Sequence, residues 1–592
     1  MSDLDTEKEA RFDLNRIVQW TGEEIELDVP DGVLPDFLID AHNAAYANDH
    51  DHALSLLTSE SLDMVARLEQ QSYPGMGLVW LILGLVHARC KQPKQALYWY
   101  HKVLDLWDHA LIYNEIATVY HKMRCYSQAL TYRTEALNRA PECLGIQGEY
   151  ALDLVHGGRL AEGLDMMQAL VDRQPTNARL HSSLLWHMHY LPGICQSRIR
   201  DASRQWAQRH TPVAWARTHY SNDPDPNRRL RIGYSSADFY RHSTCYNVEA
   251  IIEGHDRQAV ELFAYSNVSQ PDAVTKRVAG KFDHFRSVTH LDDRSLATLI
   301  EQDRIDILVI LVGHGEGHRL GACAYKPAPI QVQYQGPNTS GMSQVDYIFM
   351  DELFNPPGSE GDYVETNVNL TEGWFCYRPP ECAPAVGPLP ALTRGSVTFG
   401  ACHGSIKVNR AVVDLWSEVL RQTPGSRLIF KCPGGSDPAL RQRYADWFSQ
   451  CNVDPTRIEI IDWLSPTKHF DLYHQIDIAL DAFPLNGCVN TLEALWMGVP
   501  TVSLIGTTAV ARTGLMILTR VGLGFFACST EKEYVAKAVT LAGQLDSLAK
   551  IRQTMRDRLR ASPLLDKRRI AAQLEEKYRL IWQHWCVTGK KG

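Results

Sequence analysis

The chain has 592 residues, of which 45% are hydrophobic and 22% charged, and its formal net charge is −9. This length provides for roughly three to five domains, and the composition is that of a globular protein. The negative charge excludes a general electrostatic attraction to nucleic acid or to an anionic membrane surface. No apolar run reaches the ~18 residues that a membrane-spanning helix needs.

The N-terminal segment, 1–36, begins with an acidic and polar run that lacks the basic and apolar regions of a signal peptide. The fourteen cysteines are scattered and form no CxxC pair, as in a protein whose thiols stay reduced. We therefore expect a cytoplasmic protein without structural disulfides. Histidines and cysteines show no zinc-ligand clustering, so we expect no metal site.

Residues 37–191 are predicted to form tetratricopeptide-like helical repeats. Three small residues recur with spacings of 33 and 34, and three more stand twelve positions before them. These six are Gly84, Ala96, Ala117, Ala129, Ala151 and Gly163. Small residues allow helices to cross closely, and a 34-residue period is typical of tetratricopeptide repeats. Such arrays form a superhelix that binds peptide or protein, and this short array would also support the domains that come after it.

Residues 192–228 are predicted to be a helical connector that ends in a polar loop. An alternation of buried strands and helical segments then begins, and we assign 229–383 to a first α/β lobe. Its expected strands are 229–236, 261–265, 305–312, 330–333 and 347–350. This alternation predicts a parallel sheet with crossover helices.

A Pro-rich passage leads into a second alternating block, 384–565, which we assign to a second lobe. Its expected strands are 397–400, 427–431, 458–461, 476–480 and 501–505. Residues 566–592 read as a C-terminal amphipathic helix. Two Rossmann-like, doubly wound lobes with a cleft between them occur in GT-B glycosyltransferases. Two-lobed kinases, periplasmic binding proteins and dehydrogenases share this coarse plan.

A strand, turn and helix in the second lobe predict an anion site. The strand ends at Asp481, the turn contains Asn486 and Gly487, and the helix begins near Asn490 and Thr491. A helix that starts after a glycine turn presents free backbone N–H groups and the positive end of its dipole. This pattern favours a diphosphate site, although an ordinary strand–helix turn of an α/β domain looks the same.

Three more residues of the second lobe are candidates. His403 and Lys407 follow the first strand of this lobe, where a lysine can neutralise a departing diphosphate. His469 either stacks on a nucleobase or caps a helix as a solvated histidine. No DxD-like carboxylate pair stands near a strand end, so we expect a metal-free reaction that uses no cofactor.

In the first lobe, His242 follows the first strand. Because histidine titrates near neutral pH, His242 can orient an acceptor hydroxyl or assist proton transfer; the alternative is a surface or structurally bonded histidine. His314 lies in a polar, glycine-rich loop after the third expected strand. Pro337, Asn338 and Thr339 form a rigid turn with a small hydroxyl residue, suited to a sugar or acceptor pocket.

From residue 229 onward the chain resembles the O-GlcNAc transferase and SPINDLY glycosyltransferases, in which tetratricopeptide repeats precede a GT-B catalytic domain. The matching stretches occur in the family order: RIGYSSADFYRHS, IDILVILVGH, KPAPIQVQYQGPNTSG, VDYIFMD, VTFG, SRLIFKC, DIALDAFP, EALWMGVPTVSL and LTRVGLG. The resemblance implies that His242 is the active-site histidine. It also implies that Lys407 binds the donor diphosphate and that His469 lies beside the nucleotide base.

The chain departs from the family at the donor phosphates. The family usually has a run of threonines where this chain has Cys-Val-Asn-Thr at 488–491, and Glu493 takes the acidic position soon after it. The Gly-Tyr-Pro of the first-lobe loop is shortened here to Gly336 and Pro337. Pro466 replaces the lysine that often precedes the base-contacting histidine. These changes keep a diphosphate site but bear on the identity of the sugar and the base.

The resemblance therefore predicts an inverting, metal-independent protein O-glycosyltransferase that moves GlcNAc from UDP-N-acetylglucosamine onto Ser or Thr. The SPINDLY-like details of the matching stretches keep open GDP-fucose or another bacterial sugar, as in flagellin glycosylation. A non-catalytic repeat scaffold with a degenerate transferase domain is a further alternative. The expected partners are protein or peptide acceptors, reached through the repeats, with no nucleic acid and no membrane insertion.

Overall fold

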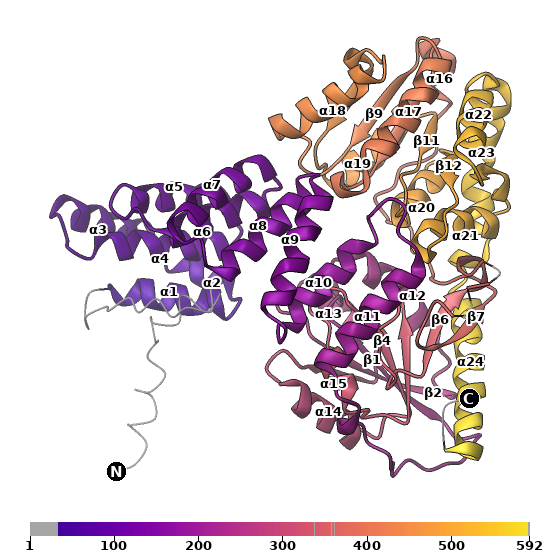
Figure 1. Cartoon of the computed structure of the whole chain (residues 1–592), viewed down its shortest axis with the longest axis horizontal. Coiled ribbons are helices and arrows are strands. Elements are labelled where there is room, and N and C mark those ends of the chain that lie inside the picture. The colour runs from indigo at the N-terminus through magenta and orange to yellow at the C-terminus, as the bar shows by residue number, and fades with distance from the viewer. Residues whose placement is uncertain (1–33, 337, 357, 360, 590–592) are drawn as a thin grey trace. The chain divides into compact units, whose positions relative to one another are not determined.

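The computed structural model describes most of the chain (Figure 1). The described residues are 34–336, 338–356, 358–359 and 361–589. Most of the predicted segment 1–36 therefore lies outside the described residues, as do Pro337 and the last three residues of the predicted C-terminal helix. The chain divides into two compact units, Met1–Leu170 with Ser436–Leu440, and Val171–Gly435 with Arg441–Gly592. Residues 171–191, predicted among the repeats, belong to the second unit.

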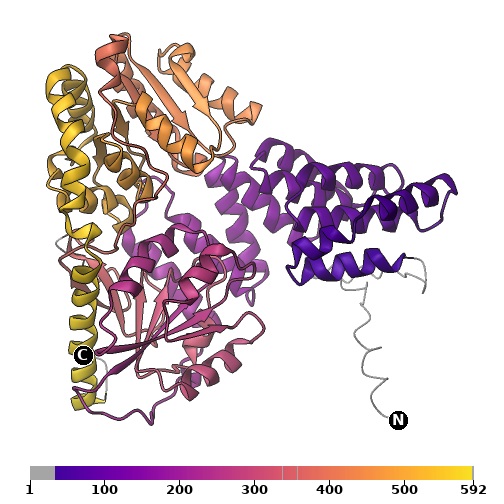
Figure 2. The ribbon, with the colours of Figure 1, turned by 180° about the vertical axis from the view of Figure 1, so that it is seen from behind.

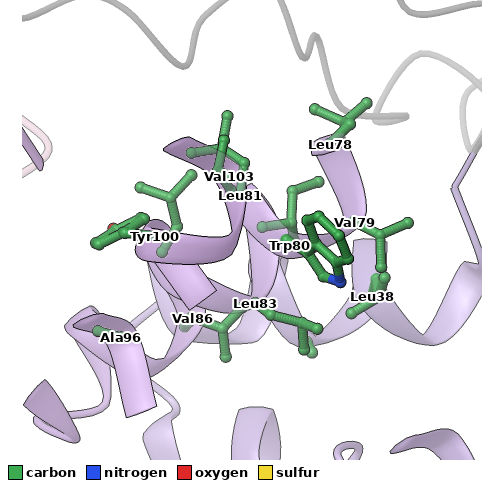
Figure 3. Packing of buried hydrophobic residues seen from close by; sticks show 14 of the residues in the cluster. Leu38, Leu78, Val79, Trp80, Leu81, Leu83, Val86, Ala96, Tyr100 and Val103 are labelled. Atoms are coloured by element: carbon green, nitrogen blue, oxygen red, sulfur yellow. The ribbon is translucent and has the colours of Figure 1, made fainter. Parts of the chain in front are cut away.

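The first unit is helical. Its helices are α1 (Asp36–Tyr46), α2 (His50–Ser55), α3 (Ser59–Gln70), α4 (Met76–Arg89), α5 (Pro93–Leu104), α6 (Ala110–Lys122), α7 (Tyr126–Arg139), α8 (Leu144–His156) and α9 (Leu160–Arg173), the last of which runs on into the second unit. Helix α4 is apolar on every side because α1, α2, α3 and α5 all pack against it. Figure 3 shows its side chains meeting Leu38, Tyr100 and Val103 in one core.

The six small residues of the repeat pattern lie where helices touch. The four alanines are fully buried. A Cβ built on Gly84 would stand 2.4 Å from the Tyr100 ring, and one on Gly163 would stand 2.6 Å from Val155. The helices approach so closely that larger side chains cannot be accommodated. The predicted helical N-terminal region is confirmed, and the close packing at these positions is consistent with tetratricopeptide-like repeats.

The second unit opens with two helices and continues into a parallel seven-stranded sheet. The helices are α10 (Ala178–Met188) and α11 (Gln196–His210), and the strands are β1 (Leu230–Ser236), β2 (Val260–Ser266), β3 (His284–Ser287), β4 (Ile307–Leu311), β5 (Ile330–Tyr334), β6 (Tyr347–Asp351) and β7 (Thr366–Leu370). The strand order is β3-β2-β1-β4-β5-β6-β7. Between the strands lie α12 (Ser243–Gly254), α13 (Ala273–Ala279), α14 (Asp293–Gln302) and α15 (Leu320–Ala324).

A second parallel sheet, of six strands, comes later in the same unit. Its strands are β8 (Thr398–Cys402), β9 (Arg427–Lys431), β10 (Ile458–Ile461), β11 (Ile478–Leu480), β12 (Thr501–Leu504) and β13 (Ala527–Cys528), in the order β10-β9-β8-β11-β12-β13. Its helices are α16 (Pro390–Arg394), α17 (Arg410–Gln422), α18 (Pro438–Gln450), α19 (Pro466–Leu472), α20 (Val489–Trp496), α21 (Thr513–Arg520), α22 (Glu531–Ala542) and α23 (Leu545–Arg560).

Both sheets have the doubly wound order that the sequence predicted. In each, the strand order reverses once, between β1 and β4 in the first sheet and between β8 and β11 in the second. Ligands of such sheets bind outside the carboxyl ends of the strands at this reversal. We call these two places the first and the second switch point.

The chain ends in α24 (Lys567–Thr588), which returns to the first sheet. Figure 2 shows α22 to α24 as a yellow column along both sheets. Tyr578 of α24 lies 3.1 Å from the hydroxyl of Tyr234 in β1, and Glu575 bonds His255 at 2.7 Å. Among the described residues, no helix combines the length and apolarity needed to cross a membrane.

Candidate active site

The turn after β11 is organised by a buried carboxylate. Asp481 Oδ1 accepts hydrogen bonds from the backbone N–H groups of Ala482 (2.9 Å) and Gly487 (2.7 Å). Ser503 Oγ donates to Oδ2 at 2.6 Å. Burial raises the pKa of the Asp481 carboxyl to about 6. The turn is therefore folded around an acidic side chain that the solvent does not reach.

Asn486 holds the same turn from its middle. Its Nδ2 donates to the carbonyl oxygens of Ala482 (3.1 Å) and Leu504 (3.3 Å), and its Oδ1 accepts from the N–H of Gly514 at 3.3 Å. The side chain predicted to bind the donor is thus engaged within the protein. Its backbone carbonyl accepts a hydrogen bond from Lys407 Nζ at 2.8 Å.

Gly487 occupies a position with no room for a side chain. A Cβ there would stand 2.8 Å from Thr491 Oγ1 and 3.1 Å from Asp481 Oδ1. Thr491 is buried and donates its hydroxyl hydrogen to the Gly487 carbonyl at 3.2 Å. Asn490 Nδ2 donates to the carbonyl oxygen of Cys402. Both polar side chains of the first helical turn therefore bond inside the lobe.

Lys407 and the start of α20 bring positive charge to this turn. Cys488 is the N-cap residue of α20, and no described side chain accepts a hydrogen bond from the N–H groups of its first turn. These groups and the helix dipole form an anion-binding end. Lys407 Nζ bonds to the carbonyl of Asn486, two residues before Cys488. Burial lowers the pKa of Lys407, and the neighbouring Asp481 opposes that shift.

His403 lies beneath the turn with one nitrogen unsatisfied. Its Nε2 donates to the carbonyl oxygen of Leu480 at 3.2 Å, so Nδ1 carries the lone pair. This buried Nδ1 has no hydrogen-bond partner among the residues that the structure describes. Burial, with a smaller contribution from Lys407, lowers the pKa of His403 to about 3. The imidazole is therefore neutral.

His469 is the centre of a three-residue chain. Lys431 Nζ lies 3.1 Å from His469 Nδ1, and Glu493 Oε2 lies 2.9 Å from His469 Nε2. An ammonium group can only donate, so Nδ1 is the acceptor and Nε2–H donates to the carboxylate. The predicted residues His469 and Glu493 come together here, and Lys431 at the end of β9 joins them.

At the first switch point, His242 is the N-cap residue of α12. Its Nδ1 accepts from the N–H of Thr244 at 3.3 Å and lies 3.4 Å from Asp238 Oδ2. The ring stacks on Tyr240 with centroids 5.5 Å apart. The side chain of His242 keeps 37% of its surface exposed. It is therefore available to a ligand while Nδ1 faces the protein.

Helix α12 also connects the two switch points. The side chain of Asn247 lies within hydrogen-bonding reach of the Cys488 thiol, and burial raises the pKa of that thiol to about 12. Asn247 belongs to the helix that His242 caps, and Cys488 caps the helix beside Lys407. The N-terminal parts of α12 and α20 therefore meet.

His314 does not face a ligand site, in contrast to the sequence-based expectation. Its Nε2 donates to the carbonyl of Ser340 at 3.1 Å, so its Nδ1 accepts from Ser182 Oγ, also at 3.1 Å. Ser182 in turn accepts from His318 Nε2 at 2.8 Å. Both nitrogens of His314 are engaged, and the side chain is buried. It joins α10 to the loop after β5.

The loop after β5 is anchored by Glu365. Thr339 Oγ1 donates to Glu365 Oε2 at 2.5 Å and accepts from the N–H of Val364 at 3.2 Å. Asn338 is buried, and neither atom of its amide has a partner within the described part of the chain. Pro337, the third residue predicted here, lies outside the described residues.

Sequence reasoning did not include Lys431, Asp481 or Asp238 among the site residues. Lys431 and Asp481 are polar residues at or just beyond the carboxyl end of a buried strand, and Asp238 stands two residues after β1. A systematic search for such strand-end residues would have found all three, because strand ends at a switch point meet the ligand. No three His, Cys, Asp or Glu side chains of the described chain are grouped to hold a metal ion.

Comparison with known protein families shows which family the chain belongs to. The model of glycosyl transferase family 41 matches residues 165–377 and 391–574. The chain belongs to glycosyl transferase family 41. The matched segments contain both sheets and every site residue named above. The predicted resemblance is confirmed.

Two relatives from Arabidopsis thaliana bear the name of a probable UDP-N-acetylglucosamine–peptide N-acetylglucosaminyltransferase. SPINDLY is 36% identical over 419 residues, which are 70% of this chain and 46% of that protein. SEC is 29% identical over 373 residues, which are 61% of this chain and 38% of that protein. The family 41 chain thus spans about half the length of SPINDLY and less of SEC.

A solved structure extends the likeness to nearly the whole fold. A mutant of the Thermobaculum terrenum O-GlcNAc transferase superposes with a TM-score of 0.81 at 32% identity. The match covers 87% of this chain and 98% of that one. The predicted arrangement of a helical region followed by two Rossmann-like GT-B lobes is confirmed.

Proposed function

We propose that this family 41 chain is an inverting protein O-glycosyltransferase that moves GlcNAc from UDP-N-acetylglucosamine onto a Ser or Thr hydroxyl. The observation that carries the proposal is the uncapped start of α20 beside Lys407. A nucleotide-sugar diphosphate fits such a site because it needs both hydrogen-bond donors and a cation. The names of the two Arabidopsis relatives support the donor and a peptide acceptor.

In this mechanism the donor diphosphate lies at the start of α20. The acceptor oxygen bonds to the anomeric carbon from the face opposite the diphosphate, while the bond between that carbon and the diphosphate oxygen breaks. The leaving oxygen keeps the electron pair, and Lys407 and the N–H groups stabilise its growing charge. His242, whose Nδ1 accepts from Thr244, orients the acceptor hydroxyl by donating its Nε2 hydrogen to that oxygen. The hydroxyl proton passes to water, so one proton leaves the acceptor for each sugar transferred.

We propose that the reaction needs no metal and no further cofactor. Lys407 and the positive end of α20 supply, at the leaving group, the charge that a divalent cation supplies in other transferases. Transfer in the presence of excess EDTA should therefore equal transfer without it. A rate that falls with EDTA and returns with added Mg²⁺ or Mn²⁺ would contradict this part of the proposal.

The nucleobase is assigned to the chain of Lys431, His469 and Glu493. Hydrogen bonds on both ring nitrogens hold the His469 imidazole in one orientation, and its faces are left for stacking. Uracil is the base in the donor named for both Arabidopsis relatives. Those names do not favour the GDP-fucose alternative.

Acceptor proteins are proposed to bind in part through the helical repeats, as superhelical arrays do. We also propose a cytoplasmic location. The fourteen cysteines are all free thiols, most of them buried, as expected of a protein that folds in a reducing compartment.

A panel of nucleotide sugars tests the donor. Wild type and Lys407→Ala are heated with UDP-GlcNAc, GDP-fucose or another nucleotide sugar, and donor hydrolysis is measured in parallel. A ligand at a hundredfold excess over its Kd stabilises the folded state by about 2.7 kcal/mol. We expect UDP-GlcNAc to stabilise wild type and to be consumed.

The control variant is Lys532→Ala, which removes an exposed lysine on α22. It should match wild type in both assays. If GDP-fucose were the one nucleotide sugar that stabilised the protein, fucose would replace GlcNAc as the proposed donor sugar. A folded protein that binds no nucleotide would favour the non-catalytic scaffold.

A further inference from the structure

Asn247 lies where the two switch points meet, and one atom of its amide is unused. It belongs to α12, the helix that His242 caps, and its side chain is within hydrogen-bonding reach of the Cys488 thiol at the start of α20. Only 6% of Asn247 is exposed. Its Oδ1 is buried and has no hydrogen-bond partner among the residues that the structure describes. A buried acceptor without a partner destabilises a fold, so this oxygen is a candidate for binding a ligand.

Helix α12 holds this amide in a fixed place. The backbone carbonyl of Asn247 accepts from the N–H of Cys376 at 3.2 Å. Two residues further along, Glu249 is fully buried and accepts from Arg277 at 2.7 and 2.8 Å. A side chain on an anchored helix keeps its position more precisely than one on a loop. The Asn247 amide is therefore preorganised at the contact between α12 and α20.

The proposed reaction brings the donor sugar to the same contact. Its diphosphate lies at the start of α20, beside Lys407, and the acceptor hydroxyl lies at His242, at the start of α12. The sugar has to lie between them, because its anomeric carbon is bonded to the diphosphate and must come within about 3 to 3.5 Å of the acceptor oxygen. Asn247 stands on the first of these helices and reaches the second.

We propose that Asn247 Oδ1 accepts a hydrogen bond from the group at C2 of the donor sugar, which in UDP-GlcNAc is the acetamido N–H. The inference rests on the proposed function of the start of α20. An amide oxygen can only accept, so the sugar group has to carry a hydrogen. C2 and the ring oxygen are the two neighbours of the anomeric carbon, and the ring oxygen has no hydrogen to donate. The group at C2 is therefore the donor nearest to the diphosphate.

The thiol beside Asn247 can give way to a sugar. Burial of the sulfur raises the pKa of the Cys488 thiol to about 12 and keeps it neutral, and a neutral thiol is a weak hydrogen-bond donor. Cys488 as a whole is partly exposed, so its side chain can turn about χ1 to another staggered rotamer. An amide N–H is a better partner for the oxygen than the thiol that it displaces.

The test compares UDP with UDP-GlcNAc in wild type and in Asn247→Leu, which keeps the size of the side chain and removes both polar atoms. Calorimetric titration gives the two Kd values of each protein. Asn247→Leu should bind UDP within about twofold of wild type and UDP-GlcNAc about tenfold more weakly, as one hydrogen bond is lost. UDP-2-deoxyglucose carries no group at C2 and should bind both proteins equally. An unchanged ratio of the Kd values for UDP and UDP-GlcNAc in the variant would overturn the proposal.

Cys488→Ala is the matched control for a purely structural role of Asn247. It removes the other side chain of the contact between α12 and α20 and leaves the Asn247 amide in place. It should change the affinities for UDP and UDP-GlcNAc by the same factor. If Asn247 only held Cys488 in position, Asn247→Leu would also weaken both ligands alike, and the assignment to the sugar would be overturned.

A second variant keeps the proposal testable if leucine prevents folding. Asn247→Ala leaves a smaller side chain that also lacks a hydrogen-bonding atom, and the same selective loss of affinity for UDP-GlcNAc is expected. The proposal concerns binding, so it can be separated from the proposed function. A wild type that shows the expected Kd values but transfers no sugar would overturn only the proposed function. A wild type that transfers GlcNAc while both variants keep its Kd ratio would overturn only the role of Asn247.

Discussion

The two switch points share one topology but are built in opposite ways. In the first sheet, the loops after β4 and β5 are cross-linked by side chains, with His314, His318 and Ser182 in one hydrogen-bonded chain. In the second sheet, the turn after β11 folds around the buried Asp481, while no side chain among the described residues caps the start of α20. The loops at the first switch point are thus held together by side-chain hydrogen bonds, whereas the second switch point leaves backbone N–H groups of α20 available to a ligand.

This difference shows that strand order alone does not assign a ligand. Both sheets reverse at the position where doubly wound folds bind ligands. What separates them is that the second also has a helix start that no described side chain caps, with a lysine beside it. His314 bonds on both ring nitrogens, whereas the one hydrogen bond of Lys407 Nζ within the described residues goes to the backbone carbonyl of Asn486. The second switch point therefore suits the proposed donor diphosphate, and at the first the partly exposed His242 is the residue proposed to meet the acceptor.

Lys407→Ala should have the largest effect. It removes the cation beside the leaving group, and we expect kcat/KM for the donor to fall about 100- to 1,000-fold. The melting temperature should change little, because in the described part of the chain Lys407 Nζ makes a single hydrogen bond, to the carbonyl of Asn486. Initial rates over a range of donor concentrations measure the effect. If Lys407→Ala transferred sugar at the wild-type rate, the assignment of the donor diphosphate to the second switch point would fail.

Asp481→Asn tests the buried carboxylate through pH. The native pKa of about 6 exceeds the ordinary value of 3.8, so between these values the native state binds more protons than the unfolded state. The contribution of the Asp481 carboxyl to the free energy of unfolding of wild type therefore decreases as pH rises through that window, and it is constant above it. Asn carries no charge, so the variant should gain up to about 3 kcal/mol over wild type between pH 4 and pH 7.

Urea unfolding of both proteins at pH 4.5 and pH 7.5 measures that gain. The imidazole nearest to Asp481 is that of His403, whose Nε2 lies 3.7 Å from Asp481 Oδ1; burial lowers the pKa of His403 to about 3, so it stays neutral in the folded protein at both pH values. A stability difference between variant and wild type that is the same at both pH values would show that Asp481 is not a buried acid.

His314→Ala should act on stability rather than on chemistry. It leaves Ser182 and the carbonyl of Ser340 without their shared partner, and we expect a loss of about 2 kcal/mol in the free energy of unfolding. The kcat of the folded fraction should remain within about threefold. A large loss of kcat with an unchanged melting temperature would return His314 to the ligand site that the sequence predicted.

Gly487→Ala should have the smallest effect of the four. The new Cβ would meet Thr491 Oγ1 at 2.8 Å, and the side-chain hydroxyl or the turn has to move. We expect donor binding to weaken about tenfold, equivalent to about 1.4 kcal/mol. Gly404→Ala is the control, because a Cβ there meets nothing closer than 3.9 Å. Calorimetric titration with UDP separates the two, and equal affinities would contradict a tight turn.

The fold was predictable where the chain carries local signals. The strand predicted at 427–431 agrees with β9, whose middle residues are buried, and that at 458–461 agrees with the edge strand β10, whose three isoleucines favour a strand. Strands β3, β7 and β13 were missed. The first two have few buried residues, β13 has only two residues, and all three lie at or next to an edge of their sheet. An edge strand need not show the apolar pattern of a central one.

By itself, the sequence determined the repeats, the two doubly wound lobes, the family and the position of Lys407 at a strand end. These depend on short-range patterns and on motifs that can be read along the chain. Only the tertiary structure decided that His314 is bonded on both nitrogens, that Lys431 and Glu493 hold His469, and that Asn486 binds the turn rather than the solvent. Most of these contacts join segments far apart in the chain, and side-chain direction is set by packing, which local pattern does not encode.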